Sequence, residues 1–165
     1  MAKIAVIMGS SSDYEVMAKC VDILKKFGIE HEVRILSAHR TPEEVHAYAS
    51  SLEENGFDVV IAAAGKAAHL AGVIAGVATL PVIGVPMKTS LMGGMDSLLS
   101  VVQMPKGIPV ATVAVDGAEN AALLAIQMLG VKHAELRNRM KKYREIMKND
   151  VLKKDAELTA LLNEK

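Results

Sequence analysis

Residues 31–44 read HEVRILSAHRTPEE, and this stretch predicts a strand that passes directly into a helix. Polar and apolar side chains alternate over residues 31–36, which is typical of a strand. Thr41 is a favoured N-cap, Pro42 suits the first helical position, and Glu44 stands where a capping box requires it. The residues between the two elements therefore form a loop at the carboxyl end of a strand, just outside a helix N-terminus.

The loop in between predicts a site that binds an anion beside an acid–base group. It carries His39, a residue type that commonly transfers protons in enzymes, and the fixed positive charge of Arg40. Open α/β sheets bind ligands at the carboxyl ends of their strands, and free N–H groups at a helix N-terminus attract anions. A loop of this composition can also be ordinary polar surface, so the local pattern alone leaves both interpretations open.

The rest of the chain alternates strands and helices in the same way. Short apolar segments predict four further strands, at residues 3–8, 57–64, 82–85 and 109–115. Helices are expected between the strands and after the last one, and Ser12 with Glu15 repeats the capping-box spacing at the first helix. No linker or internal repeat interrupts the pattern. The chain, residues 1–165, is therefore predicted to be a single three-layer α/β domain with a central five-stranded parallel sheet.

Two more predicted loops carry small and polar residues at the same edge of the sheet. Residues 9–13 read GSSSD, whose hydroxyls exceed what one helix cap requires and suit a phosphate, while the aspartate suits ribose hydroxyls. Residues 65–69 read GKAAH, which places His69 after a third strand. Residues 89–95, rich in glycine and methionine, predict a mobile loop over the same edge. Together the loops predict a phosphorylated, ribose-like ligand and proton transfer by His39.

The amino-acid composition limits the classes of binding partner and cofactor that are expected. The 19 basic and 19 acidic residues give a formal net charge of zero, so no binding of nucleic acid or of a membrane surface is expected. Cys20 is the only cysteine and the histidines lack metal-ligand spacing, so neither a disulfide nor a metal site is expected. Residues 70–87 carry no charge, but Pro81 and Pro86 interrupt them, which favours a helix and a strand over a membrane span. The apolar start lacks a signal-peptide pattern, which predicts a cytoplasmic protein.

The tail from His133 to Asn163 predicts one long charged helix. It carries an apolar stripe at helical spacing, formed by Leu136, Met140, Tyr143, Met147 and Val151. A helix of this length extends about 45 Å, whereas a domain of this size has a radius of gyration of roughly 15 Å. Residues 132–163 are therefore expected to pack partly on a neighbouring subunit.

Four motifs, taken in order, resemble those of the class I N5-carboxyaminoimidazole ribonucleotide mutases of purine biosynthesis. They are Gly9-Ser10 with Ser12-Asp13, Ser37-Ala38-His39-Arg40-Thr41-Pro42, Ala67-Ala68-His69-Leu70, and Asp96-Ser97-Leu98-Leu99-Ser100 with Gln103-Met104-Pro105. The resemblance covers roughly residues 3–129. It implies a flavodoxin-like subunit, commonly in an octamer, that converts N5-carboxyaminoimidazole ribonucleotide to the 4-carboxy isomer without ATP, a metal or another cofactor.

The resemblance also implies roles for individual residues. His39 matches the general acid/base of the family. The positions that hold the phosphate and ribose are matched by Ser10, Ser12, Asp13, Ser37 and Arg40. The other residues that the resemblance places around the substrate are Gly9, Gly65, Ala68, His69 and Leu70. Ala67, Ala68 and His69 are expected to wall the moving carboxylate.

Two residues depart from the family's third loop, which usually reads Gly-Gly-Ala-Ala-His-Leu-Pro-Gly. Lys66 stands in place of the second glycine and Ala71 in place of the proline. A glycine there permits a positive φ, which lysine tolerates poorly, so the shape of this loop is open. Lys66 would also bring a positive charge near the carboxylate.

Two other functions remain open at this point. The class II enzymes carboxylate aminoimidazole ribonucleotide directly with carbon dioxide, but their loop typically has Ser-Asn where this chain has Ala68-His69. The retained histidine therefore favours class I. A non-catalytic nucleotide- or flavin-binding module of flavodoxin type is the other alternative, although only Tyr14 lies near the first loop to stack on a flavin.

Overall fold

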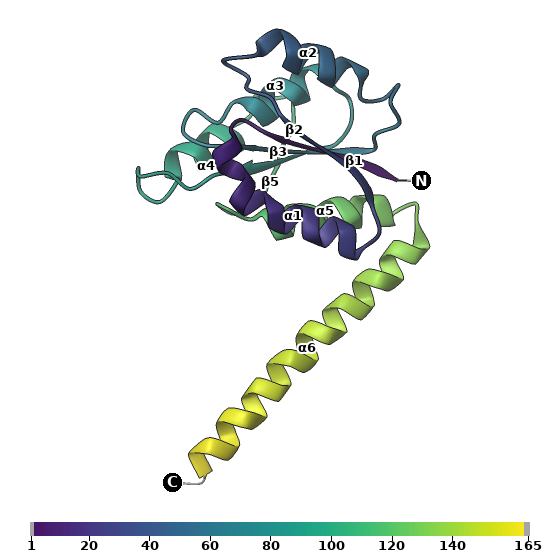
Figure 1. Cartoon of the computed structure of the whole chain (residues 1–165), viewed down its shortest axis with the longest axis vertical. Coiled ribbons are helices and arrows are strands. Elements are labelled where there is room, and N and C mark those ends of the chain that lie inside the picture. Colours follow the sequence, from purple (N-terminus) through teal and green to yellow (C-terminus); the bar gives the residue numbers. More distant parts are fainter. Residues whose placement is uncertain (1, 164–165) are drawn as a thin grey trace.

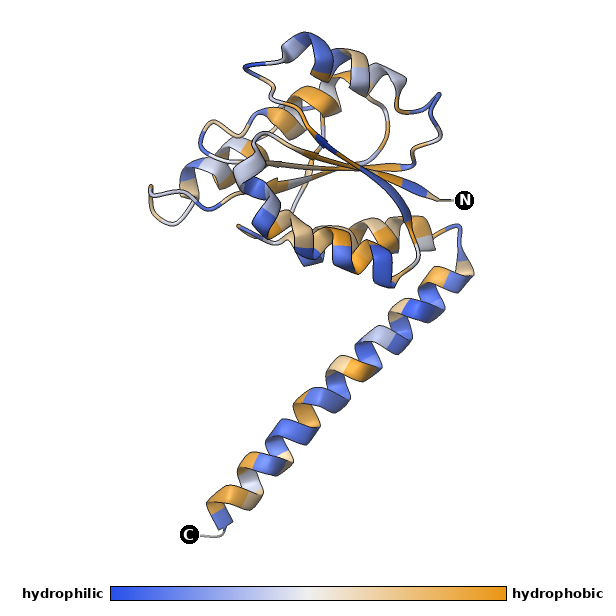
Figure 2. Ribbon diagram, in the orientation of Figure 1, coloured by the Kyte–Doolittle hydropathy of each residue, from blue (hydrophilic) through white to orange (hydrophobic). Residues whose placement is uncertain are grey.

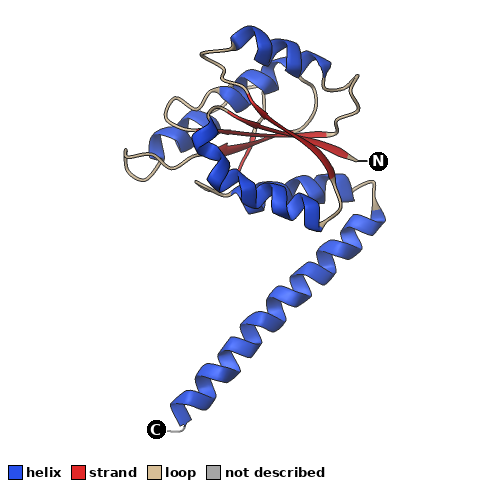
Figure 3. Cartoon of the chain, in the orientation of Figure 1, coloured by secondary structure: helices blue, strands red, loops and turns tan. Residues whose placement is uncertain are grey.

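The computed structural model describes residues 2–163 and contains a five-stranded parallel sheet in the order β2-β1-β3-β4-β5. The strands are β1 (Lys3–Met8), β2 (Glu30–Ile35), β3 (Val59–Ala64), β4 (Val82–Pro86) and β5 (Ala111–Thr112). The helices are α1 (Tyr14–Lys26), α2 (Pro42–Ser51), α3 (Leu70–Val77), α4 (Met95–Val102), α5 (Ala118–Gly130) and α6 (Ala134–Asn163). Figure 3 shows the alternation of strands and helices, which confirms the predicted flavodoxin-like α/β fold with a long C-terminal helix.

Helices cover both faces of the sheet, with α2 and α3 on one face and α1 and α5 on the other (Figure 1). Val101 of α4 packs into the same core as α2 and α3. Side chains of β1 show why. Ile4, Val6 and Met8 pack into the core on the α1 and α5 side, whereas Ala5 and Ile7 pack into the core on the opposite side. A strand buried on both faces requires an unbroken apolar run, which is what the sequence of β1 supplies.

The fifth strand is much shorter than predicted. The expected strand at residues 109–115 contains only the two residues of β5. The chain continues beside β4, where Val113 N–H donates to Gly84 O and Asp116 N–H donates to Pro86 O, but the ladder is not regular. This segment lies at the edge of the sheet and starts at a proline, which has no N–H to donate, so little holds it in a full strand.

Both predicted capping boxes are wrong in their side-chain bonds. A short 3₁₀ turn, η1 (Ser11–Asp13), precedes α1, and it is Ser10 whose hydroxyl accepts the N–H of Ser12 at 3.3 Å. Helix α2 begins where predicted, but Thr41 Oγ1 does not cap it. That hydroxyl instead accepts the Ser37 N–H at 2.9 Å and donates to Ser37 O at 3.1 Å. It therefore closes the loop that precedes the helix.

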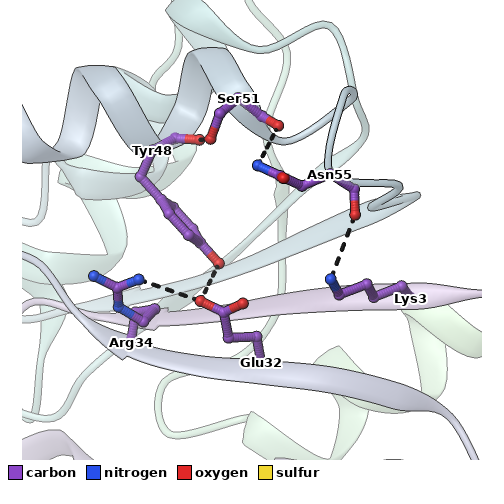
Figure 4. A network of polar contacts seen from close by, with 6 residues as sticks. All are labelled: Lys3, Glu32, Arg34, Tyr48, Ser51 and Asn55. Atoms are coloured by element: carbon purple, nitrogen blue, oxygen red, sulfur yellow. Dashed lines mark hydrogen bonds and ion pairs between the residues drawn. The ribbon is translucent and has the colours of Figure 1, made fainter.

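Strand β2 forms one edge of the sheet and carries charged side chains. Glu32 pairs with Arg34 at 3.3 Å and accepts a hydrogen bond from the Tyr48 hydroxyl of α2 (Figure 4). The Arg34 guanidinium also lies over the Tyr48 ring, 5.2 Å from its centroid. Burial, and after it the Glu32 carboxylate, raises the pKa of Tyr48, so this hydroxyl remains a donor. The network ties α2 to the edge strand.

The structure decides between the interpretations of two sequence features. The uncharged residues 70–87 divide into α3 and β4, as predicted. Among the described residues, no helix combines the length and apolar character that crossing a bilayer requires. Cys20 is fully buried in α1, and burial raises the pKa of its thiol to about 12. The predicted core role of this thiol is confirmed.

Helix α6 projects away from the domain as one continuous helix (Figure 1). Only its first turns pack: Leu136 and Met140 are buried, and the Tyr143 ring lies 5.6 Å from that of Phe27. Figure 2 shows apolar residues recurring among hydrophilic ones along the remainder. Met147 and Val151 are 51% and 66% exposed. The apolar stripe of α6 thus continues beyond the surface of its own domain.

Gly84 in β4 tests how tightly the sheet packs on α4. An added Cβ would lie 2.9 Å from Val110 Cγ1 and would also clash with Val101 Cγ1. We expect Gly84→Ala to lower the free energy of unfolding by about 1–3 kcal/mol. In α3, a Cβ on Gly76 would meet no atom within 4 Å, so Gly76→Ala is expected to gain about 0.5–1 kcal/mol. Urea unfolding of both variants measures the difference, and equal stabilities would contradict this packing.

Candidate functional site

Four loops meet around a cavity of about 630 Å³ at the carboxyl edge of the sheet. These loops follow β1, β2, β3 and β4. They meet because parallel strands bring their carboxyl ends to the same edge of the sheet. The lining residues are Gly9, Ser10, Ser12, Asp13, Ser37, Ala38, His39, Arg40, Ala64, Gly65, Lys66, Ala67, His69, Leu70, Met87, Lys88, Thr89 and Ser90. The cavity thus gathers every site residue predicted from the sequence except Ala68, which is fully buried in the core beneath the loop.

Arg40 joins the first two loops at one side of the cavity. Its guanidinium donates to Gly9 O at 2.7 Å and to Ser37 Oγ at 3.3 Å. The hydroxyls of Ser10 and Ser12 lie 2.9 Å apart on the neighbouring loop. A guanidinium has further N–H donors beyond these two bonds, so this group of side chains can bind a phosphate.

Asp13 stands next to these anion-binding groups. Burial raises the pKa of its carboxyl. A backbone hydrogen bond with Ser10, a side-chain hydrogen bond with Ser12 and the charge of Arg40 lower this pKa, but by less. A carboxylate accepts hydrogen bonds only. Asp13 is therefore suited to sugar hydroxyls, which donate, and unsuited to the phosphate itself.

The imidazoles of His39 and His69 meet in the cavity. His39 Nε2 lies 2.9 Å from His69 Nδ1, and the ring centroids are 4.9 Å apart in an edge-to-face arrangement. A hydrogen bond between two ring nitrogens requires a proton on one of them and a free lone pair on the other. The pair can therefore hold a proton and pass it on. The two residues follow β2 and β3, which flank β1, and this strand order could not be read from the sequence.

The structure settles the shape of the loop after β3, which the sequence had left open. Lys66 has a φ of +57°, in the left-handed region. Its carbonyl accepts hydrogen bonds from Ala68 N–H at 2.9 Å and from Ser100 Oγ at 3.2 Å. Ala71 is the second residue of α3, where an N–H needs no helical partner. The second departure from the family's loop therefore leaves the start of the helix intact.

The loop after β4 is anchored at both ends by Ser97, a residue of the fourth motif to which the sequence assigned no role of its own. Ser97 is fully buried, and its hydroxyl lies 2.5 Å from Met87 O and 2.8 Å from Gly94 O. At the tip between them, Leu91 and Met92 are 57% and 77% exposed. The loop is therefore fixed at its base and free at its tip.

Two lining residues of this loop, Met87 and Lys88, were also missed, whereas Thr89 and Ser90 belong to the mobile loop predicted at residues 89–95. The Lys88 N–H donates to Asp116 Oδ1 at 2.8 Å, and Thr89 Oγ1 donates to Asp96 Oδ1 at 2.5 Å. The Thr89 hydroxyl is the main cause that lowers the pKa of Asp96. For Met87 and Lys88, the signal available in the sequence was their position directly after a buried strand. Within residues 2–163, no group of three or more His, Cys, Asp or Glu side chains is placed to hold a metal ion.

Comparison with known proteins places these features among related chains. Residues 3–150 match the family model described as AIR carboxylase. The chain is 58% identical over 152 residues to an N5-carboxyaminoimidazole ribonucleotide mutase of Saccharolobus solfataricus, covering 92% of this chain and 96% of the relative. It is 53% identical over 154 residues to a mutase of the same name from Thermotoga maritima, covering 93% and 90%. The crystal structure of Treponema denticola PurE superposes with a TM-score of 0.85 at 32% identity, covering 96% of this chain and 99% of that one.

Asp13→Asn tests the electrostatics of the cavity. The folded-state pKa of Asp13 is raised above its ordinary value of 3.8, so ionisation costs stability as pH rises through the folded-state pKa. We expect Asp13→Asn to raise Tm at pH 7 by up to about 2 °C, since solvent screens a partly exposed group. The gain should vanish below pH 3.8, where Asp13 is protonated in both states. Thermal melts across this range measure it, and a pH-independent difference would count against the assignment.

Proposed function

The chain belongs to the AIR carboxylase family, and on that premise we propose that it is an N5-carboxyaminoimidazole ribonucleotide mutase of purine biosynthesis. Its reaction converts N5-carboxyaminoimidazole ribonucleotide to 4-carboxy-5-aminoimidazole ribonucleotide. The observation that carries the proposal is the contact of His39 and His69 in a cavity that also holds Arg40 and two serine hydroxyls. An acid–base pair and an anion site thus face one ligand.

The mutase reaction balances without a further reactant. The carbamate N–C bond breaks and carbon dioxide leaves, while the exocyclic nitrogen gains a proton. The ring carbon then attacks carbon dioxide, forms the new C–C bond and loses its own proton. We assign this proton transfer to His39, because a histidine is suited to give and take protons near neutral pH. The site must also hold carbon dioxide away from water.

His69 supports this role through its hydrogen bond to His39. Its ring nitrogen lies 2.9 Å from His39 Nε2, so it can orient the imidazole and share its proton. The arrangement favours an enzyme over a non-catalytic nucleotide-binding module, and the mutase names of relatives that match nearly the whole chain favour isomerisation over direct carboxylation.

Substrate binding divides between the two sides of the cavity. On one side, Ser10, Ser12, Ser37 and Arg40 are assigned to the phosphate and Asp13 to the ribose. On the other side, the backbone of residues 65–70 borders the ring and the moving carboxylate. Ala68 contributes there through the packing that supports the loop, since its side chain is buried.

The loop of residues 87–94 is assigned the role of a lid. Its base is anchored by the buried Ser97, while its tip is exposed, and Met92, Gly93 and Gly94 have positive φ values of 45°, 68° and 105°. Closure of such a loop would exclude water while carbon dioxide is free.

We further propose that the protein is a cytoplasmic homo-oligomer, an octamer by family resemblance. Support for assembly comes from the exposed continuation of the apolar stripe on α6. A groove of about 370 Å³ between α5 and α6 extends it and is lined by Leu123, Leu124, Met140, Tyr143 and Met147, among others. Residues 132–163 are thereby assigned to pack on a neighbouring subunit. A single buried thiol is compatible with a reducing compartment.

His39→Asn tests the proposed chemistry. We expect turnover of N5-carboxyaminoimidazole ribonucleotide to fall by about 10²–10⁴-fold, because a general acid/base contributes this much, while the fold is retained. Formation of the 4-carboxy product is measured without ATP and with a no-enzyme control, since the carbamate decomposes unaided. A parallel reaction offers aminoimidazole ribonucleotide with bicarbonate, to detect direct carboxylation.

The matched control for this variant is His46→Asn, an exposed histidine of α2 outside the cavity. It should keep wild-type turnover. Near-normal activity of His39→Asn would remove the assignment of the general acid/base. Inactivity of the wild-type protein with the N5-carboxy substrate would remove the proposed function itself.

The double variant Met147→Asp, Val151→Asp tests assembly through α6. Burying two carboxylates in an apolar contact is costly, so we expect smaller particles in light scattering after size-exclusion chromatography. Asn149→Asp introduces one carboxylate on the opposite side of the helix and should leave the particle size unchanged. A monomeric wild-type protein at micromolar concentration, or an unaltered double variant, would contradict the assembly proposal.

A further inference from the structure

Lys66 adopts a backbone conformation that costs a lysine free energy. Its φ of +57° lies in the left-handed region, where a non-glycine residue is strained by about 1 kcal/mol or more. Within the described chain, the other non-glycine residues with positive φ are Met92 and Asp116. All three lie in loops at the carboxyl edge of the sheet. Strain of this kind persists where the surroundings hold it in place, and it concentrates at functional sites.

Packing does not explain why a lysine stands at this position. The side chain is exposed and lines the cavity, and no carboxylate among residues 2–163 forms an ion pair with it. The hydrogen bonds that hold the residue, from Ala68 N–H and Ser100 Oγ, go to its carbonyl oxygen. A glycine would offer the same carbonyl without the strain. The ammonium group is therefore the one feature that sets lysine apart here.

The nearby acidic residue does not neutralise Lys66. Asp96 accepts the Thr89 hydroxyl at 2.5 Å, and this bond is the main cause that lowers the pKa of the carboxyl. The charge of Lys66 contributes less, and the two side chains form no ion pair. The ammonium group thus remains available to a ligand in the cavity.

The cavity carries cationic side chains on both sides of β1. Arg40 follows β2 and Lys66 follows β3, so the two loops start about 10 Å apart at the usual spacing of strands. The guanidinium of Arg40 is bonded to Gly9 and Ser37, beside the serine hydroxyls. Lys66 instead shares its loop with His69. Two anionic groups on one ligand would match these two cations.

We propose that Lys66 determines specificity by binding the carboxylate of the carboxylated nucleotides. The inference rests on the proposed function: substrate and product each carry a phosphate and a carboxylate, whereas aminoimidazole ribonucleotide carries the phosphate alone. With the phosphate on the Arg40 side, the carboxylate lies on the side of Lys66 and His69. Lys66 therefore favours the carboxylated nucleotides over the decarboxylated one.

Calorimetric titration with 4-carboxy-5-aminoimidazole ribonucleotide and with aminoimidazole ribonucleotide tests this role. Lys66→Met removes the charge, Lys66→Gly removes both charge and strain, and Lys66→Arg keeps the charge. We expect the Met and Gly variants to bind the 4-carboxy nucleotide about tenfold more weakly, the loss typical of one charged contact. Their affinity for aminoimidazole ribonucleotide should stay within about twofold, and Lys66→Arg should retain the preference of the wild type.

Two further lysines complete the test. Lys106→Met alters an exposed lysine outside the cavity and should change neither affinity. Lys88→Met alters the other lysine of the cavity, and a loss of carboxylate preference confined to this variant would overturn the proposal.

Other outcomes distinguish a failure of the specificity role of Lys66 from a failure of the proposed mutase function. Unchanged binding of both nucleotides by Lys66→Met would overturn the specificity role. Equal weakening of binding for both nucleotides would also overturn it, because such a loss reports a change of loop shape and not the loss of a charge. A wild-type protein that prefers the 4-carboxy nucleotide through Lys66, yet does not form it from the N5-carboxy isomer, would overturn the mutase function and leave the carboxylate contact standing.

Discussion

The common direction of all five strands is the constraint on which the site depends. Parallel strands send every following loop to the same edge, and the order β2-β1-β3 places the loops of residues 37–40 and 65–69 on either side of β1. In this arrangement His39 reaches His69, and Arg40 reaches Gly9 O. The crossover helices that parallel pairing requires also bury both faces of the sheet. The parallel direction of the strands thus accounts both for the burial of the two faces of the sheet and for the meeting of the loop residues in the cavity.

Much of this fold could be predicted because two-sided burial leaves a clear mark on the sequence. The strand at residues 3–8 is apolar almost throughout, and its bounds were confirmed. Prediction failed where a local side-chain bond competes with the expected one. The Thr41 hydroxyl has a choice of backbone partners, and it bonds to Ser37 instead of capping its helix. The predicted length of the fifth strand was also wrong. This strand lies at the edge of the sheet, where pairing on one side alone does not enforce a regular ladder.

The candidate site was predictable loop by loop but not as an assembly. Each loop shows its own signal, a histidine or a run of hydroxyls after a strand, whereas the pairing of His39 with His69 follows from strand order. The shape of the loop at Lys66 was left open by the sequence, and the structure shows that lysine keeps the positive φ that a glycine would permit there. Ala68 and Ser97 could not be placed, because small side chains suit a cavity wall and a tightly packed core equally well.

The edges of the sheet decide how copies of this chain can meet. Exposed strand edges invite other strands to pair with them, which leads to fibrils and uncontrolled aggregation. Here one edge, β2, carries the charged network of Glu32 and Arg34 with Tyr48, and the other edge, β5, is only two residues long. Neither offers a template for continuing the sheet into a second molecule. Growth of the sheet by strand addition is thereby disfavoured at both ends.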